Sequence, residues 1–107
     1  SQDTFAPMGP YLVTADEVND PQSLDLWCKV NGETRQKANT SDMIFDVKTI
    51  ISTLSDGITL EVGDVFATGT PSGVGAAHPS GLLKVGDVIE CGVEKLGVMR
   101  NEVVSEK

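Results

Sequence analysis

Residues 24–31 alternate between apolar and polar side chains and run directly into an Asn31-Gly32 pair. The period of two is typical of a β-strand with one buried face. The apolar positions are Leu24, Leu26, Cys28 and Val30. Asn-Gly favours a type I′ turn, because both central residues of that turn need a positive φ. The sequence therefore predicts an antiparallel hairpin whose polar return strand, from Glu33 to about Lys37, lies at an edge of a sheet.

One amphipathic helix is predicted over about residues 42–55. Several residues that favour helix N-caps stand together at positions 39–42 (Asn-Thr-Ser-Asp), directly before the apolar stripe begins. Apolar residues then recur three and four positions apart, as on one face of a helix. They are Ile44, Val47, Ile51 and Leu54, with Met43 and Ile50 beside them. Gly57 follows Asp56 and is a natural left-handed cap that ends the helix.

The second half of the chain is predicted to be mostly strand, over residues 64–68, 87–94 and 97–104, with a hairpin at 95–97. Two similar pieces, LEVGDV and LKVGDV, precede the first two strands. In each piece glycine permits a turn and aspartate can hydrogen-bond the local backbone. The 107 residues are thus predicted to form one α+β domain, mostly β, with one packed helix near 42–55.

Composition and charge exclude several classes of function. The formal net charge is −8, which disfavours nucleic acids and anionic membrane surfaces as partners. A hydrophobic fraction of 39% is ordinary for a soluble globular protein. There is no apolar run long enough to span a bilayer, and the first ten residues lack the features of a signal peptide. We therefore expect a cytoplasmic location.

The two cysteines, Cys28 and Cys91, each lie within a strand-like apolar run. Neither has the CxxC spacing of zinc or dithiol redox sites. Two buried free thiols in a reducing cytosol are the expectation. Whether the two side chains meet, and whether they form a disulfide, is left open by the sequence.

The segment most suggestive of chemistry is ATGTPSGVG, residues 67–75. Backbone N–H groups in such a glycine-rich loop can surround an anion or a carboxylate, and the Thr70 hydroxyl can donate to a carbonyl oxygen. The alternative is a set of tight turns with no ligand. The segment is neither a phosphate-binding P-loop nor a dinucleotide fingerprint, because the Gly-Lys-Ser/Thr ending and the GxGxxG unit are missing.

Other reactive residues give weaker signals. His78 is the single histidine and stands between Ala77 and Pro79, where an exposed, inactive side chain is expected. Asp3, Asp16 and Glu17 are expected to be solvated loop acids. No close set of ligands and no GxSxG nucleophile elbow appears. From the residues alone, the prediction is an α+β domain with a Gly/Thr-rich loop that contacts a small ligand.

Four segments in order resemble the fumarylacetoacetate hydrolase family across residues 3–104. They are DTFAPMGPYLVTADEV, DPQSLDLWCKVNGETRQKANTSDMIF, LEVGDVFATGTPSGVG and LLKVGDVIECGVEKLGVMRNEVV. The resemblance implies an incomplete mixed β-roll or sandwich of that family. It also implies a divalent-metal-dependent enzyme, with Mg or Mn, that acts on 2-oxo acid or 1,3-dicarbonyl substrates. Acylpyruvate hydrolysis, decarboxylation and isomerisation are the implied reactions, and a homodimer is the implied assembly.

The resemblance also assigns roles to residues. It implies that Gly69, Thr70 and Pro71 bind substrate and that Thr70 is catalytic. The family's lysine would stand one position before Ser1, and Gln2 departs from the usual aromatic residue. The acidic metal ligands and the His–Glu pair of the lid match nothing in this chain. We therefore expect residues 1–107 to be the C-terminal portion of a catalytic domain, paired with an N-terminal part or with a second copy, and inactive alone. The alternatives are a small β-rich binding module and a subunit that complements a separate chain.

Overall fold

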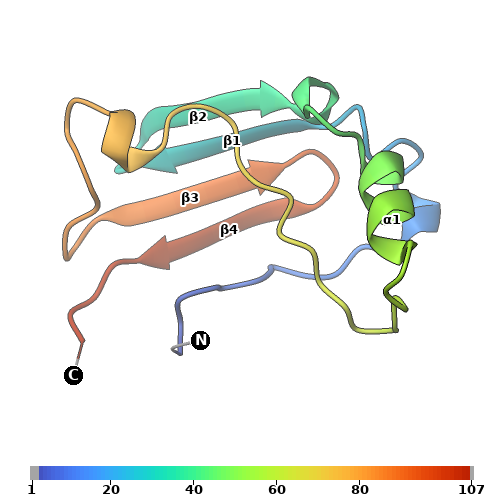
Figure 1. Ribbon diagram of the computed structural model, residues 1–107. Coiled ribbons are helices and arrows are strands. Elements are labelled where there is room, and N and C mark those ends of the chain that lie inside the picture. The colour runs from blue at the N-terminus through green and yellow to red at the C-terminus, as the bar shows by residue number, and fades with distance from the viewer. Residues whose placement is uncertain (1–2, 107) are drawn as a thin grey trace.

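The computed structural model describes residues 3–106, which form one antiparallel sheet with a short helix at one end (Figure 1). The strands are β1 (Asp25–Val30), β2 (Glu33–Asn39), β3 (Val88–Val93) and β4 (Gly97–Glu102), and the helix is α1 (Val47–Ser55). Three single turns of 3₁₀-helix, η1 (Ala15–Glu17), η2 (Thr40–Asp42) and η3 (Gly75–Ala77), lie in the connections. The predicted α+β class, mostly β, is confirmed.

The four strands are ordered β2-β1-β3-β4, and each neighbouring pair is antiparallel. Asn31 and Gly32 have φ values of 51° and 81°, as the predicted turn between β1 and β2 requires. The polar strand β2 lies at an edge of this sheet, as its composition predicts. The predicted hairpin at residues 95–97 joins β3 to β4, with positive φ at Lys95 and Gly97.

The two faces of the sheet follow from the alternation in β1. Cys28 lies opposite Gln36 in β2 and opposite Cys91 in β3, so these three residues share one face. Trp27 lies opposite Gly92 on the other face, where a β-carbon at Gly92 would collide with the indole ring. The segment that follows α1 runs back across the sheet and reaches β2 near Gly73 (Figure 1). This return brings the glycine-rich segment onto the sheet.

The helix begins later than predicted. Instead of continuing from Asp42, the chain makes the single turn η2, in which the side chains of Asn39 and Asp42 form a capping box. The helix α1 starts at Val47, where the Asp46 side chain accepts a hydrogen bond from the Thr49 N–H at 2.7 Å. The predicted end at Ser55 is confirmed, and Gly57 has a φ of 100°. Ile44 therefore precedes the helix, and its side chain is 91% exposed.

The predicted strand at residues 64–68 is wrong, because the segment is extended but pairs with no described strand. Strand propensity needs a hydrogen-bonding neighbour to take effect. The repeated turn that precedes it is confirmed. Asp64 accepts from the Glu61 N–H, and Asp87 accepts from the Lys84 N–H, each at 2.8 Å. Only the second turn leads into a strand, β3.

Little of the chain is fully buried. The buried apolar side chains among the described residues are Val18, Leu24 and Val30. Large apolar side chains remain exposed in the N-terminal segment, around α1 and in the return segment; they include Phe5, Met8, Leu12, Ile44, Phe45, Val62, Val65 and Leu82. Helix α1, with nine residues, has no buried side chain, so the predicted packing of this helix is only partial. Within residues 3–106 no helix has the length and apolar character needed to cross a bilayer.

Candidate functional site

The glycine-rich segment, residues 67–75, forms an irregular loop whose first half is open to solvent. Gly69 and Gly73 have φ values of 94° and 104°, which place both in the left-handed region that favours glycine. Gly69 and Thr70 are exposed, whereas Pro71 is half-buried. The three predicted substrate-binding residues are consecutive in this loop, and the first two of them are open to solvent.

Gln36 in β2 holds this loop through its side-chain amide. Its Nε2 donates to the Thr70 Oγ1 at 2.8 Å and to the Pro71 carbonyl oxygen at 2.8 Å. A primary amide nitrogen carries two hydrogens, so both are used. The pair of bonds joins the strand to the two residues on which the predicted chemistry depends.

A close backbone contact reinforces this attachment. The register between β1 and β2 shifts between Cys28 and Lys29, which leaves Arg35 as the extra residue of a β-bulge. Gly73 lies directly against the Arg35 carbonyl group, and a β-carbon there would collide with it. The bulge and the glycine thus let the loop backbone pack on the edge strand.

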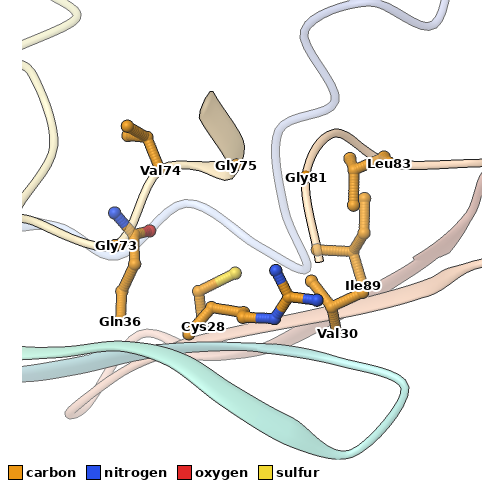
Figure 2. Close-up of a pocket in the computed structure, with 10 residues that line it drawn as sticks. Cys28, Val30, Gln36, Gly73, Val74, Gly75, Gly81, Leu83 and Ile89 are labelled. Atoms are coloured by element: carbon orange, nitrogen blue, oxygen red, sulfur yellow. The ribbon is translucent and has the colours of Figure 1, made fainter. Parts of the chain in front are cut away.

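Beneath the second half of the loop lies a cavity of about 130 Å³ with a mostly apolar lining. Its walls include Val30, Ile89 and Leu83, and Figure 2 shows Gln36 reaching from β2 toward Gly73 at its rim. The Arg35 side chain, 11% exposed, also lines it. The Arg35 Nε has no hydrogen-bond partner among the described residues and lies 3.8 Å from a Glu33 carboxylate oxygen. Thr70 does not line this cavity and is exposed.

His78 is less exposed than expected. Its side chain is 22% exposed, its Nε2 lies 3.3 Å from Glu33 Oε1, and its Nδ1 lies 2.7 Å from Ser80 Oγ. Both ring nitrogens therefore contact protein groups, and His78 is half-buried where an exposed side chain is predicted. The contacts attach the turn after η3 to the start of β2.

The two cysteines, whose relation the sequence left open, meet across the sheet. The Cys91 thiol donates to the Cys28 sulfur, with 3.4 Å between the two Sγ atoms, and both thiols are free. Burial, and then the hydrogen bond to Cys28, raises the pKa of Cys91 from 9.0 to about 11. A thiol with a pKa this high is protonated at neutral pH, so it is a poor nucleophile.

Metal-binding residues do not come together in the part of the chain that the structure describes. Within residues 3–106 there is no group of three or more His, Cys, Asp or Glu side chains that could hold a metal ion. His78 and Glu33 are adjacent, but two ligands are fewer than Mg²⁺ or Mn²⁺ requires, and these ions prefer oxygen ligands. The described residues therefore do not fit a divalent metal site.

Gln36 was not among the site residues that the sequence predicts. It stands 34 positions before Thr70, and the side-chain contact between the two residues leaves no local pattern in the sequence. Its setting in the polar return strand of a hairpin predicts only an exposed edge. The contact becomes visible once the loop is placed on β2.

The sequence matches one protein family over nearly its whole length. The family model described as fumarylacetoacetate (FAA) hydrolase C-terminal matches residues 1–104. A 2,4-didehydro-3-deoxy-L-rhamnonate hydrolase of Sphingomonas sp. (strain SKA58) is 54% identical over 103 residues, which are 94% of this chain and 36% of that protein. A human mitochondrial oxaloacetate tautomerase is 48% identical over 103 residues, 95% of this chain and 33% of its own length.

The fold has solved counterparts as well. The crystal structure of maleylpyruvate hydrolase from Sphingobium sp. SYK-6, in complex with manganese(II) ion and pyruvate, superposes with a TM-score of 0.88 at 45% identity. The match covers 98% of this chain and 38% of that one. The chain thus spans between 33% and 38% of the length of these relatives. With a matching family model over nearly all of its residues, the chain belongs to the fumarylacetoacetate hydrolase family, in the C-terminal region of that family's domain.

Proposed function

We propose that this chain supplies the substrate loop of a divalent-metal-dependent enzyme that acts on 2-oxo acid or 1,3-dicarbonyl compounds. The observation that carries the proposal is the exposed Thr70 hydroxyl, held on the glycine-rich loop by the Gln36 amide at 2.8 Å. The relatives support the substrate class, since they include a maleylpyruvate hydrolase, an oxaloacetate tautomerase and a sugar-acid hydrolase. We assign Gly69, Thr70 and Pro71 to substrate binding, and Thr70 to catalysis.

The proposed role of Thr70 is to donate its hydroxyl proton in a hydrogen bond to the 2-oxo oxygen of the substrate. When an acylpyruvate is hydrolysed, the electron pair of the broken C–C bond passes to the methylene carbon and forms the enolate of pyruvate. By then a water oxygen has added to the acyl carbon, which leaves as a carboxylate; one water proton is released and the other ends on the enolate carbon. Negative charge grows on the 2-oxo oxygen during this step, so a fixed donor stabilises the transition state more than the ground state.

The same donor serves the other reactions of the proposed class. Tautomerisation moves a proton between carbon 3 and the 2-oxo oxygen, and decarboxylation of a 3-carboxylated 2-oxo acid leaves its electron pair on carbon 3. Both pass through an enol or enolate with charge on the same oxygen. The loop can therefore serve each reaction of the class, and groups elsewhere in the enzyme determine which reaction occurs.

The metal ion must be held by other residues. Because residues 3–106 lack a suitable ligand set, we propose that the acidic ligands of the Mg²⁺ or Mn²⁺ ion belong to a part of the enzyme other than this chain. The manganese complex of the maleylpyruvate hydrolase supports a divalent ion in a related enzyme. On this proposal, the 107 residues alone do not turn over substrate.

Exposed apolar surface supports a partner that covers this chain. Phe5, Met8 and Leu12 in the N-terminal segment are 75%, 76% and 94% exposed, and Val62 is fully exposed. Side chains of this kind usually face another protein surface when they gather in number. We propose that they pack against polypeptide equivalent to the rest of the relatives' length, in an assembly that is itself a homodimer. A net charge of −8 makes nucleic acids and anionic membranes poor candidates for that partner.

The proposal is tested by turnover assays on two samples, the complete enzyme and residues 1–107 alone. Each is mixed with Mn²⁺ or Mg²⁺ and with an acylpyruvate or oxaloacetate, and pyruvate release or keto–enol exchange is measured. The expected result is metal-dependent turnover by the complete enzyme and none by residues 1–107. Turnover by the 107-residue chain alone would show that the catalytic groups lie within it. A complete enzyme that processes none of these substrates would overturn the substrate class.

A further inference from the structure

Gln36 can give the Thr70 hydroxyl a direction as well as a position. The Pro71 carbonyl oxygen can only accept a hydrogen bond, and it lies 2.8 Å from the Gln36 Nε2. This contact requires the nitrogen, not the oxygen, of the Gln36 amide to face the loop. The same nitrogen lies 2.8 Å from the Thr70 Oγ1, so it must donate there too.

A hydroxyl that accepts from an amide cannot at the same time donate to it. The single Thr70 hydroxyl hydrogen therefore points away from Gln36, and Thr70 lies on the exposed side of the loop. An oxygen that accepts one hydrogen bond is also a better donor in the next, because the bonds polarise one another. The geometry leaves Thr70 as a donor toward whatever occupies the open side.

The loop and the strand also meet through their backbones beside Gln36. The residue is half-buried in β2, directly opposite Cys28 of β1, and the neighbouring bulge at Arg35 packs against Gly73. The loop and the strand therefore meet at two adjacent points, one through side chains and one through backbone. Rotation of Thr70 away from Gln36 would cost the loop one of these attachments.

We infer that Gln36 is a positioning residue, which orients the Thr70 hydroxyl so that its proton is donated to the substrate oxygen. The inference rests on the proposed function of Thr70. Gln36 itself touches no reacting atom. Its contribution depends on its being a donor, and an acceptor of the same size and shape would reverse the Thr70 hydroxyl and direct its proton toward the strand.

Gln36→Glu makes that change with almost no change in shape. In the complete enzyme at neutral pH, the ionised carboxylate accepts from Thr70, and it also repels the Pro71 carbonyl oxygen. The expected loss in kcat is about 10- to 100-fold, with little change in KM. This is somewhat smaller than the kcat loss expected when a group that donates directly to the transition state is removed. Activity should recover as the pH falls and the introduced carboxyl takes up a proton. Thr34→Glu, at an exposed position of the same strand, adds the same charge and should leave kcat unchanged.

A double-mutant cycle shows whether Gln36 acts through Thr70. In an enzyme that already carries Thr70→Val, the added Gln36→Glu should cost less than about 3-fold in kcat, because the hydroxyl that it would misdirect is gone. Full additivity of the two losses would overturn the inference. It would mean that Gln36 supports the loop or the fold independently of Thr70.

A readout without turnover separates this inference from the proposed function. In the ¹⁵N-labelled complete enzyme, the side-chain NH₂ of Gln36 should show slow hydrogen exchange, and Thr70→Val should shift one of its two proton resonances. If Thr70→Val leaves both resonances unchanged, the bond does not exist and the inference fails. If the resonance shifts but neither substitution alters turnover, the bond exists and the proposed function of Thr70 fails instead.

Discussion

The carbonyl oxygen of Arg35 occupies the space that a β-carbon on Gly73 would need. Gly73 also has a φ of 104°, which side chains disfavour even in open space. Two separate constraints thus require glycine at the point where the candidate substrate loop meets β2. The contact turns a flexible glycine-rich segment into a loop with a defined position.

Gly73→Ala should therefore displace the loop from β2. We expect a loss of about 2 kcal/mol or more in the free energy of unfolding, from left-handed backbone strain plus the collision. Urea denaturation measures the loss, and hydrogen exchange at residues 69–75 should become faster. Gly57→Ala is the matched control, since Gly57 has a φ of 100° but none of the described residues lies within 4 Å of the added carbon. Equal losses for the two variants would contradict the close packing at Gly73.

Because of the Cys28–Cys91 pair, we expect the free energy of unfolding to fall at alkaline pH. The pKa of Cys91 is about 11 in the folded protein, against 9.0 for the free thiol, because burial and the Cys28 thiol favour the protonated form. The folded state therefore holds the proton more tightly than the unfolded state. The resulting stability is complete below pH 9 and is lost as the pH rises toward 11.

The alkaline loss of stability is checked by denaturing wild type and Cys91→Ala at a series of alkaline pH values. The alanine variant is expected to be less stable at pH 7, because it loses buried volume, but its stability should fall less steeply between pH 9 and 11. The comparison of slopes removes the contribution of lysines and tyrosine, which titrate in both proteins. Parallel curves would show that the Cys91 thiol ionises as readily in the folded state as in the unfolded one.

The contacts of Asp87 should make the folded protein less stable in acid, which is the opposite pH dependence. Its pKa is lowered from 3.8, first by the hydrogen bond from the Lys84 N–H and then by that from the Asn31 side chain. The folded state releases this proton more readily, so the stability gained is present above pH 3.8 and is lost as the pH falls through the folded pKa. Asn31 in turn accepts from the Val88 N–H at 2.8 Å, so the contact ties the first hairpin turn to the start of β3.

Asp87→Asn should lower the free energy of unfolding at pH 7, since the amide offers one acceptor where two are used. The difference from wild type should shrink on acidification, as the wild-type carboxylate protonates. Asp64→Asn is the control in the twin turn, where the carboxylate accepts from the Glu61 N–H and from no other group within residues 3–106, and its cost should be smaller. A cost for Asp87→Asn that stays the same from pH 7 to pH 3 would mean that charge plays no part in this contact.

The sequence predicts best those elements whose signals are local. The Asn31-Gly32 turn, the edge position of β2 and the hairpin of β3 and β4 follow from the alternating pattern and from glycine. The repeated turns at Asp64 and Asp87 follow from four-residue patterns. The turns and hairpins depend on contacts within a few positions in the chain, so the residue types alone specify them. The edge position of β2 follows instead from the polar composition of that strand.

The sequence does not specify features whose local pattern fits two structures, or features that depend on residues far away in the chain. The N-cap residues at 39–42 do form a cap, but for the separate turn η2, and a second cap at Asp46 starts α1. Residues 64–68 have strand-like composition, yet the described sheet offers them no neighbour. Gln36 joins the candidate site through a contact 34 residues away in sequence. Such features depend on where segments lie in the folded chain, and local propensity does not determine that.

The most direct test of this account is kcat for Thr70→Val beside Thr70→Ser in the complete enzyme. Valine keeps the shape of threonine and removes the hydroxyl, whereas serine keeps the hydroxyl and its bond to Gln36. If Thr70 donates to the developing enolate, valine should lower kcat by about 30- to 1,000-fold, equivalent to about 2–4 kcal/mol, while serine should stay within about 5-fold of wild type. A correctly folded Thr70→Val enzyme with wild-type kcat would contradict the claim that this loop carries the chemistry.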